Sequence, residues 1–144
     1  MDVSVGISLL ALLVAGLSAL YTKRTAEEAH QTNRIALYPA RNEIFRAFRE
    51  VGGNLTAHGT EIPKPVVLDF YKHVEASKFV FSSKPQVPKE LEAFYRGLDE
   101  LVELQRRTDP VSNKKAFSTL EDCEARKLRT QKLLESVLRE AGDV

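Results

Sequence analysis

The sequence is poor in cysteine, has no tryptophan and carries no strong excess of charge of either sign. Cys123 is the one cysteine among 144 residues, and a lone cysteine cannot close an internal disulfide. A disulfide-stapled secreted domain is therefore excluded, which fits a reducing compartment. The 21 basic and 20 acidic residues leave a net charge of +1. Because domains that bind nucleic acids usually carry a clear basic excess, we expect no nucleic-acid partner.

The motifs that carry common enzyme chemistry are also missing. Neither the Walker loop nor GxGxxG, the glycine-rich patterns that cradle phosphates, occurs in the chain. Cys123 has acidic neighbours, which oppose formation of the reactive thiolate, so we expect it to be a small core residue. Asp69 and His73 are four residues apart and can face one metal ion on a helix, but a third ligand would have to come from Glu75 or His58. Because two ligands do not make a site, we expect no catalytic residue, no metal and no cofactor.

Several carboxylates fall in one expected helix, at residues 88–107. They alternate with an apolar stripe, so we interpret them as its solvated face. Carboxylates in one site carry out acid–base catalysis when their surroundings separate their pKa values. An enzyme therefore stays open as a less favoured alternative, to be revived by carboxylates that converge in a pocket. The residues concerned are Glu90, Glu92, Asp99, Glu100 and Glu103.

The longest uncharged stretch is the N-terminal segment from Val3 to Thr22. A helix of this length spans about 30 Å, the thickness of the hydrocarbon core of a bilayer. A cleaved signal peptide begins with a basic region, whereas this chain begins with Met1 and Asp2. The segment therefore predicts an uncleaved transmembrane anchor at residues 1–22, with the lipid bilayer as its partner.

The residues that flank this segment predict its orientation. Lys23 and Arg24 follow it directly, and basic residues stay on the cytoplasmic side of a membrane. We therefore expect a single-pass protein of the inner (plasma) membrane with its N-terminus outside and its C-terminal domain in the cytoplasm.

Small residues recur along one face of the same segment at steps of three and four. Such a stripe lets two membrane helices approach closely, which predicts self-association of the anchor. The alternative is that serine and alanine are simply tolerated in a single span. The stripe consists of Ser4, Ser8, Ala11, Ala15 and Ala19.

The rest of the chain reads as helical, and no segment alternates with the period of two that a strand requires. Residues 23–38 are polar on all sides at first and predict a juxtamembrane helical stalk. Pro39 either starts a new helix or kinks a long one, and residues 39–144 form the predicted bundle domain. We expect an all-α protein with about four bundle helices, at residues 40–51 (ended by Gly52 and Gly53), from Pro65, at 88–107, and from Ser112 or Asn113 to Ala141.

The segment after the anchor carries a recognisable pattern. It consists of Asn33, Arg34, Ile35, Ala36 and Leu37, followed by Arg41, Glu43 and Ile44. With the leucine-rich span before it, this pattern resembles a group of small bacterial single-pass membrane proteins of uncharacterised activity with an NRIAL-type juxtamembrane helix. The resemblance covers mainly the first third of the chain. It implies a bacterial inner-membrane location and no particular activity.

Two functional hypotheses follow in addition to the less favoured enzyme. The leading one is a non-catalytic interaction or scaffold module at the bacterial inner membrane, whose bundle binds a cytoplasmic protein or a second copy of the chain. The alternative is an envelope-structural protein with a periplasmic helical domain, which requires the opposite topology.

Overall fold

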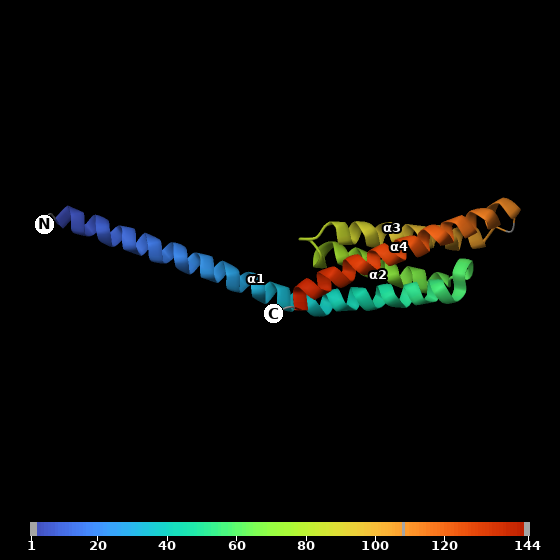
Figure 1. The fold of residues 1–144 in the computed structure, drawn as a ribbon, viewed down its shortest axis with the longest axis horizontal. Coiled ribbons are helices and arrows are strands. Elements are labelled where there is room, and N and C mark those ends of the chain that lie inside the picture. The colour runs from blue at the N-terminus through green and yellow to red at the C-terminus, as the bar shows by residue number, and fades with distance from the viewer. Residues whose placement is uncertain (1–2, 108, 143–144) are drawn as a thin grey trace. The chain divides into compact units, whose positions relative to one another are not determined.

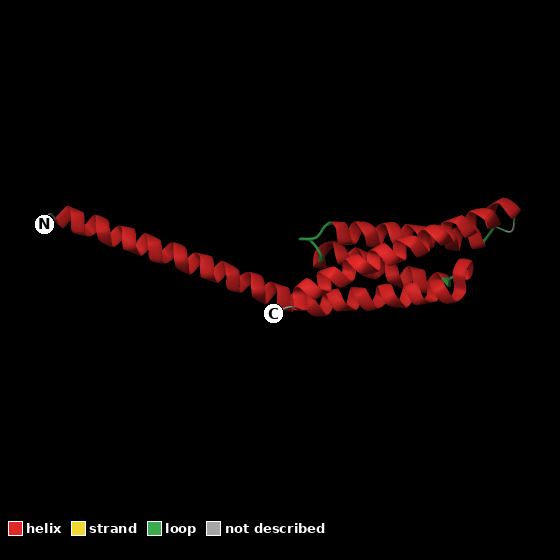
Figure 2. Cartoon of the chain, viewed as in Figure 1, coloured by secondary structure: helices red, strands yellow, loops and turns green. Residues whose placement is uncertain are grey.

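The computed structural model describes residues 3–107 and 109–142. Within them, the side chains of residues 3–10, 13, 30, 31, 33–35, 141 and 142 lie outside the description. Every regular element of the described residues is helical, so the prediction of an all-α protein is confirmed (Figures 1 and 2). The chain divides into two units, residues 1–36 and Leu37–Val144. The elements are α1 (Val3–His58), the 3-10 turn η1 (Gly59–Glu61), α2 (Lys64–Val80), α3 (Gln86–Gln105) and α4 (Pro110–Gly142).

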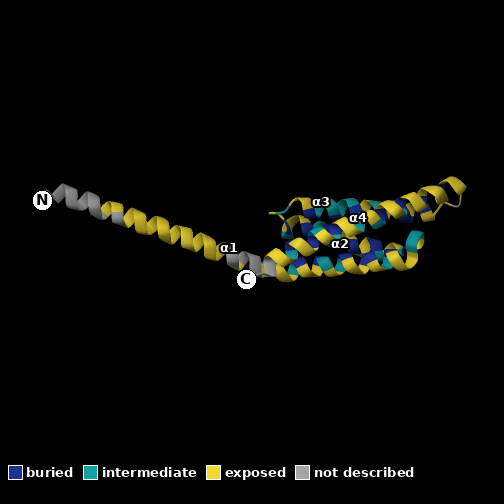
Figure 3. Cartoon of the chain, viewed as in Figure 1, coloured by how far each residue is buried: buried dark blue, intermediate teal, exposed yellow. Residues whose placement is uncertain are grey.

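The first unit contains the N-terminal part of α1. Its described apolar side chains are exposed, and Figure 3 colours the described residues of this part of α1 as exposed. Among the residues that the structure describes, no helix is long and apolar enough to cross a membrane. The predicted membrane helix at residues 3–22 includes positions 3–10 and 13, whose side chains lie outside the description. The exposed apolar residues are Leu12, Val14, Leu17, Leu20 and Tyr21.

The second unit is a helical bundle, as the sequence predicts. It consists of the C-terminal part of α1 together with α2, α3 and α4, and its buried apolar residues form one cluster between Ile44 and Val137. Three phenylalanines join three of these helices at the centre, with ring centroids 5.3 to 6.4 Å apart. Rings at such distances and tilts gain attraction beyond the burial of their surface. They are Phe48 of α1, Phe70 of α2 and Phe94 of α3.

The C-terminal part of α1 enters the bundle through a regular apolar stripe. Ile44, Phe48, Val51 and Leu55 follow one another at steps of four, three and four, and all are buried. Residues at these steps lie on one face of a helix. Pro39 lies inside α1, so no new helix begins at this proline.

Two glycines within α1 were predicted to end the helix at residue 51, and that prediction is wrong. A Cβ on Gly52 would lie 3.1 Å from Cδ of Lys127, so the glycine leaves room for a side chain of α4. The helix ends at His58, because Gly59 adopts φ +58°. This left-handed conformation suits glycine and ends many helices. Of the three glycines in this stretch, Gly59 is therefore the one that ends the helix, and Gly52 and Gly53 lie within it.

The connection from α1 to α2 is held by the far end of α3. The side-chain amide of Gln105 donates hydrogen bonds to the carbonyl oxygens of Thr60 (2.7 Å) and Ile62 (3.0 Å). Ile62 is buried in the core. Residues 54–58 therefore belong to α1, and residues 59–63 form a short connection that is fixed to the bundle.

The last helix starts earlier than predicted. Asp109, directly before Pro110, accepts hydrogen bonds from the backbone N–H (2.9 Å) and the hydroxyl (2.6 Å) of Ser112. A side-chain acceptor at this position satisfies a free N–H of the first turn, and proline suits the first helical position. The cap is thus Asp109, and neither Ser112 nor Asn113 caps the helix.

Helix α4 turns a partly polar face towards the core. Its buried residues follow at steps of three, four and seven, yet some of these positions hold hydroxyl side chains. Thr130 is fully buried, and its hydroxyl has no hydrogen-bond partner among the described residues. This composition leaves only a weak apolar stripe in the sequence of the helix. The buried residues are Ser112, Ala116, Thr119, Cys123, Thr130, Leu134 and Val137.

Candidate functional site

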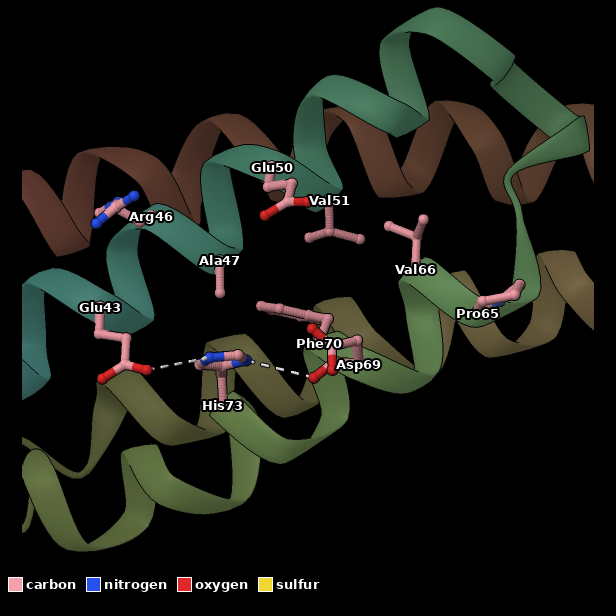
Figure 4. Close-up of a pocket in the computed structure, with 10 residues that line it drawn as sticks. All are labelled: Glu43, Arg46, Ala47, Glu50, Val51, Pro65, Val66, Asp69, Phe70 and His73. Carbon is pink, nitrogen blue, oxygen red and sulfur yellow. Dashed lines mark hydrogen bonds and ion pairs between the residues drawn. The ribbon is translucent and has the colours of Figure 1, made fainter.

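A cleft of about 450 Å³ opens between α1 and α2. Figure 4 shows charged side chains of both helices around a floor of apolar ones. The cleft lies within the unit Leu37–Val144. Its lining residues are Glu43, Arg46, Ala47, Glu50 and Val51 of α1, and Pro65, Val66, Asp69, Phe70 and His73 of α2.

His73 is the most enclosed polar side chain of this cleft, with 23% of its surface exposed. Its Nδ1 lies 3.3 Å from the backbone oxygen of Asp69, one turn earlier in α2, and donates to it in the tautomer that carries the proton there. Its Nε2 lies 3.9 Å from Oε1 of Glu43 on α1. The dashed lines of Figure 4 mark both contacts. The imidazole is therefore held between two helices, with a carboxylate facing it from α1.

Asp69 and His73 lie on one cleft, as their spacing suggested, but they do not form a metal site. The carboxylate of Asp69 accepts a hydrogen bond from Nζ of Lys72 at 2.9 Å, and this cation lowers the pKa of Asp69. Glu75, one of the residues from which a third ligand could have come, pairs with Lys78. Among the described residues, no group of three histidines, cysteines or carboxylates is placed to hold a metal ion.

The cleft offers no hydroxyl or thiol nucleophile. None of its ten lining residues carries such a group, and a histidine that acts as a general base needs one within hydrogen-bond reach to activate it. The arrangement can bind a polar or charged group, but it does not assemble the parts of an acyl-transfer site.

The carboxylates of α3 lie at the surface and do not converge in a pocket. Four of the five pair with a basic side chain, and the fifth, Asp99, is exposed. Their sites are therefore ordinary solvated ion pairs, which contribute little to stability. The pairs are Glu90 with Arg126 (3.3 Å), Glu92 with Arg96 (2.7 Å), Glu100 with Lys115 (2.8 Å) and Glu103 with Arg106 (3.3 Å).

Cys123 is a buried core residue, as predicted. Burial, with a smaller contribution from the charge of Asp122, raises the pKa of its thiol to about 11. A thiol with this pKa is almost entirely protonated at neutral pH and is a poor nucleophile. A Cβ on Gly97 of α3 would lie only 2.6 Å from the Cys123 sulfur. The thiol therefore fills a close contact between α3 and α4.

The arginines near the start of the bundle do not form one basic surface. Arg41 is only 8% exposed, and its guanidinium lies 5.5 Å from the ring centroid of Phe81. Arg49 is exposed and lies 6.0 Å from the ring of Phe45. Arg41 is therefore enclosed by the bundle, whereas Arg49 faces solvent, so the two do not present a shared exposed basic surface.

The residues predicted around the membrane anchor lie on α1. Ala11, Ala15 and Ala19 are exposed, whereas the side chains of Ser4 and Ser8 lie outside the described residues. Lys23 is exposed as well. Arg24 pairs with Glu28, with its Nε 3.3 Å from the carboxylate. Self-association through the small residues stays a prediction.

The sequence analysis missed a second feature of α2, its solvent-facing side. Leu68, Lys72, Glu75 and Phe79 follow at steps of four, three and four, opposite the buried face of the helix. Phe79 is 81% exposed and Leu68 is 48% exposed. Helical spacing, which predicted the buried face, also links these four residues. The polar pair Lys72 and Glu75 between the two apolar residues concealed the row in the sequence.

Comparisons of the chain with protein-family models, curated proteins and solved structures find no match. The resemblance of residues 33–44 to small bacterial membrane proteins therefore stays a prediction. Within the described residues, the features with potential for recognition are the mixed-charge cleft and the solvent-facing row of α2.

Proposed function

We propose that this chain is a single-pass protein of the bacterial inner membrane that presents a non-catalytic helical interaction module to the cytoplasm. The observation that carries the proposal is the contrast within α1. Apolar side chains surround its N-terminal part, while the bundle buries a single apolar stripe of its C-terminal part.

The anchor is supported by the sequence of residues 3–22 and by the exposure of its described side chains. No charged residue interrupts this stretch. Leu12, Leu17 and Leu20 project from a helix into the surroundings. Contiguous exposed apolar surface of this kind is uncommon on soluble monomers and marks contact with a membrane or another protein. A bilayer provides apolar surroundings on every side of the helix.

The orientation is supported by the charges next to the anchor. Lys23 and Arg24 follow it, and Asp2 precedes it. The bias of lysine and arginine near the ends of a span sets its topology, whereas acidic residues contribute little. The N-terminus then lies outside and the unit Leu37–Val144 lies in the cytoplasm.

The non-catalytic role is supported by the bundle. The lining residues of the His73 cleft include no hydroxyl or thiol group, and the carboxylates of α3 are dispersed in surface pairs. Cys123 is buried and protonated. These features favour recognition of another macromolecule over chemistry.

The experiment is a pair of C-terminal fusions in bacterial cells, one to a fluorescent protein that matures in the cytoplasm and one to a phosphatase that is active in the periplasm. We expect fluorescence, no phosphatase activity, and retention in the membrane fraction after an alkaline wash. A control variant carries Asp2→Lys, Lys23→Gln and Arg24→Gln. Because these substitutions reverse the charge bias, we expect phosphatase activity to rise in it.

Two outcomes would overturn the proposal. An active phosphatase fusion of the unaltered chain favours the envelope-structural alternative with a periplasmic domain. Release of the chain by the alkaline wash removes the anchor altogether. The interaction role is contradicted separately if the full chain is monomeric in detergent and in-cell cross-linking joins it to no other protein.

A further inference from the structure

We propose that the solvent-facing row of α2, consisting of Leu68, Lys72, Glu75 and Phe79, pairs antiparallel with the same row of a second copy of the chain. This inference deepens the proposed interaction role by naming the partner and the surface, and it rests on that role. The contact uses only residues of the unit Leu37–Val144.

The first observation is the exposure of two large apolar side chains at the ends of the row. Phe79 is the most exposed phenylalanine of the bundle, and Leu68 is half exposed, on a helix whose opposite face is fully packed. Beside them, Tyr71 stacks on Tyr95 of α3 with ring centroids 4.9 Å apart. Aromatic residues of this kind are enriched where proteins contact one another.

The second observation is the charge pattern between the two apolar residues. Lys72 and Glu75 occupy the middle of the row. Their contacts run along α2 itself, from Lys72 to Asp69 and from Glu75 to Lys78 and Tyr71. Steps of four, three and four form the seam by which two helices pack side by side. The row therefore presents an apolar residue at each end and one charge of each sign at its centre.

This pattern selects one way for two copies to pair. In an antiparallel pair about a two-fold axis, Leu68 faces Phe79 of the other copy and Lys72 faces its Glu75. Both contacts occur twice, as an interface between identical surfaces requires. In a parallel pair each lysine faces a lysine and each glutamate faces a glutamate, and such like-charge contacts are unfavourable. Charge complementarity thus favours a second copy in the antiparallel register.

The contact is short. From Leu68 to Phe79 the helix rises about 16 Å. A row of this length buries less surface than a standard interface, which buries about 1,600 Å². We therefore expect a weak, reversible dimer whose population rises with concentration. Its charged centre also implies that salt weakens it.

The register is tested by disulfide cross-linking of the full chain in detergent, on a background in which Cys123→Ala removes the native thiol. The variants Leu68→Cys and Phe79→Cys are purified separately and then mixed under mild oxidation. We expect the mixture to form cross-linked dimers several-fold faster than either variant alone. A parallel pair gives the reverse result, with each variant cross-linking to itself, and would overturn the register. Equal, slow rates in all three samples overturn the pairing.

The charge pattern is tested by sedimentation of the same full chain. Lys72→Glu and Glu75→Lys each place like charges opposite one another, so each is expected to weaken dimer formation about tenfold, whereas the double variant restores opposite charges and recovers most of the affinity. Lys114→Glu, on an exposed position of α4, is the matched control and should change nothing. A double variant no better than the singles contradicts the proposal. These readouts concern pairing, and the fusion experiment concerns location, so either proposal can fail while the other stands.

Discussion

The two parts of α1 place apolar residues in opposite ways. In residues 11–21 the described apolar side chains are exposed on every side of the helix, whereas from Ile44 onwards they form one buried stripe. The same secondary structure thus serves two environments. A stripe needs a partner on one side only, which the bundle provides. A helix that is apolar all round needs apolar surroundings on all sides, which is the physical basis for the proposed anchor.

The largest expected effect comes from placing charged residues within the exposed apolar stretch of α1, at residues 11–21. Leu12→Arg together with Leu17→Arg puts two arginines near the middle of the uncharged stretch, and each costs about 2.5–3.5 kcal/mol on insertion at the centre of a membrane helix. We expect the chain to move from the washed membrane fraction to the soluble fraction. Fractionation followed by immunoblotting measures this shift.

The control for this variant lies in the other part of the chain. Leu128 of α4 is 58% exposed, so Leu128→Arg adds the same side chain to the surface of the bundle. It should leave the fractionation unchanged. If the Leu12 and Leu17 variant stays in the membrane as firmly as the Leu128 variant, residues 3–22 do not act as the anchor.

The packing of the bundle is tested by truncating an aromatic side chain of its core. Phe94 is fully buried between Phe48 and Phe70, and replacing a buried phenylalanine by alanine typically costs 3–5 kcal/mol. We expect Phe94→Ala to lower the free energy of unfolding by about this amount, measured by urea denaturation of the full chain in detergent with circular dichroism.

An exposed phenylalanine supplies the matched control. Phe117 of α4 is 63% exposed, and surface substitutions away from special features usually change stability by less than about 0.5 kcal/mol. A loss in Phe117→Ala as large as that in Phe94→Ala would show that α4 packs differently from the described structure.

The sequence predicted the fold where apolar spacing was regular and failed where another residue type took a core position. The helix α3 was predicted because leucine, phenylalanine and valine fill its buried apolar stripe. In α4, Ser112, Thr119 and Thr130 occupy buried positions, and no periodicity of apolar residues reveals them. Gly52 was mistaken for a helix end because a glycine that admits a neighbouring side chain looks the same in sequence as one that ends a helix.

The candidate sites were predictable only within one helix. Asp69 and His73 share a cleft because four residues make one turn, which spacing reveals. The approach of Glu43 from α1 to His73 depends on how two helices pack, and nothing in a single sequence specifies that contact. The row from Leu68 to Phe79 was readable, since it needs only helical spacing, but its exposure had to be known before it could suggest a partner.

A substitution at Gly97 tests the close packing of α3 against α4, and its expected effect on the free energy of unfolding is smaller. Because a Cβ on Gly97 meets the Cys123 sulfur at 2.6 Å, Gly97→Ala forces the two helices apart or the thiol aside, and overpacking of this kind typically costs about 1–3 kcal/mol. The helix preference of alanine offsets part of this. We expect a net loss of roughly 1 kcal/mol in the same urea measurement, recovered in part by adding Cys123→Ala.

Gly53 is the control for this substitution. No atom lies within 4 Å of a Cβ built there, so Gly53→Ala should stabilise the chain by about 0.5–1 kcal/mol through helix preference alone. If both glycine variants stabilise the chain equally, α3 and α4 are not as close at Cys123 as described.

The smallest expected effect is the pH dependence of Cys123. Its pKa is raised from 9.0 to about 11 by burial, so the folded thiol stays protonated where the unfolded thiol has begun to ionise. Stability from this group is complete below pH 9 and falls as the pH rises from 9 towards 11, because protons then leave the unfolded chain first. We expect alkylation of the folded chain at pH 8 to be far slower than in urea, whereas a cysteine introduced at the exposed position Phe117 of α4 should react at a similar rate in both. Equal rates for Cys123 in the two states would mean that the contact between α3 and α4 opens freely, and the difference between the packed and the exposed part of the chain would then be smaller than the structure indicates.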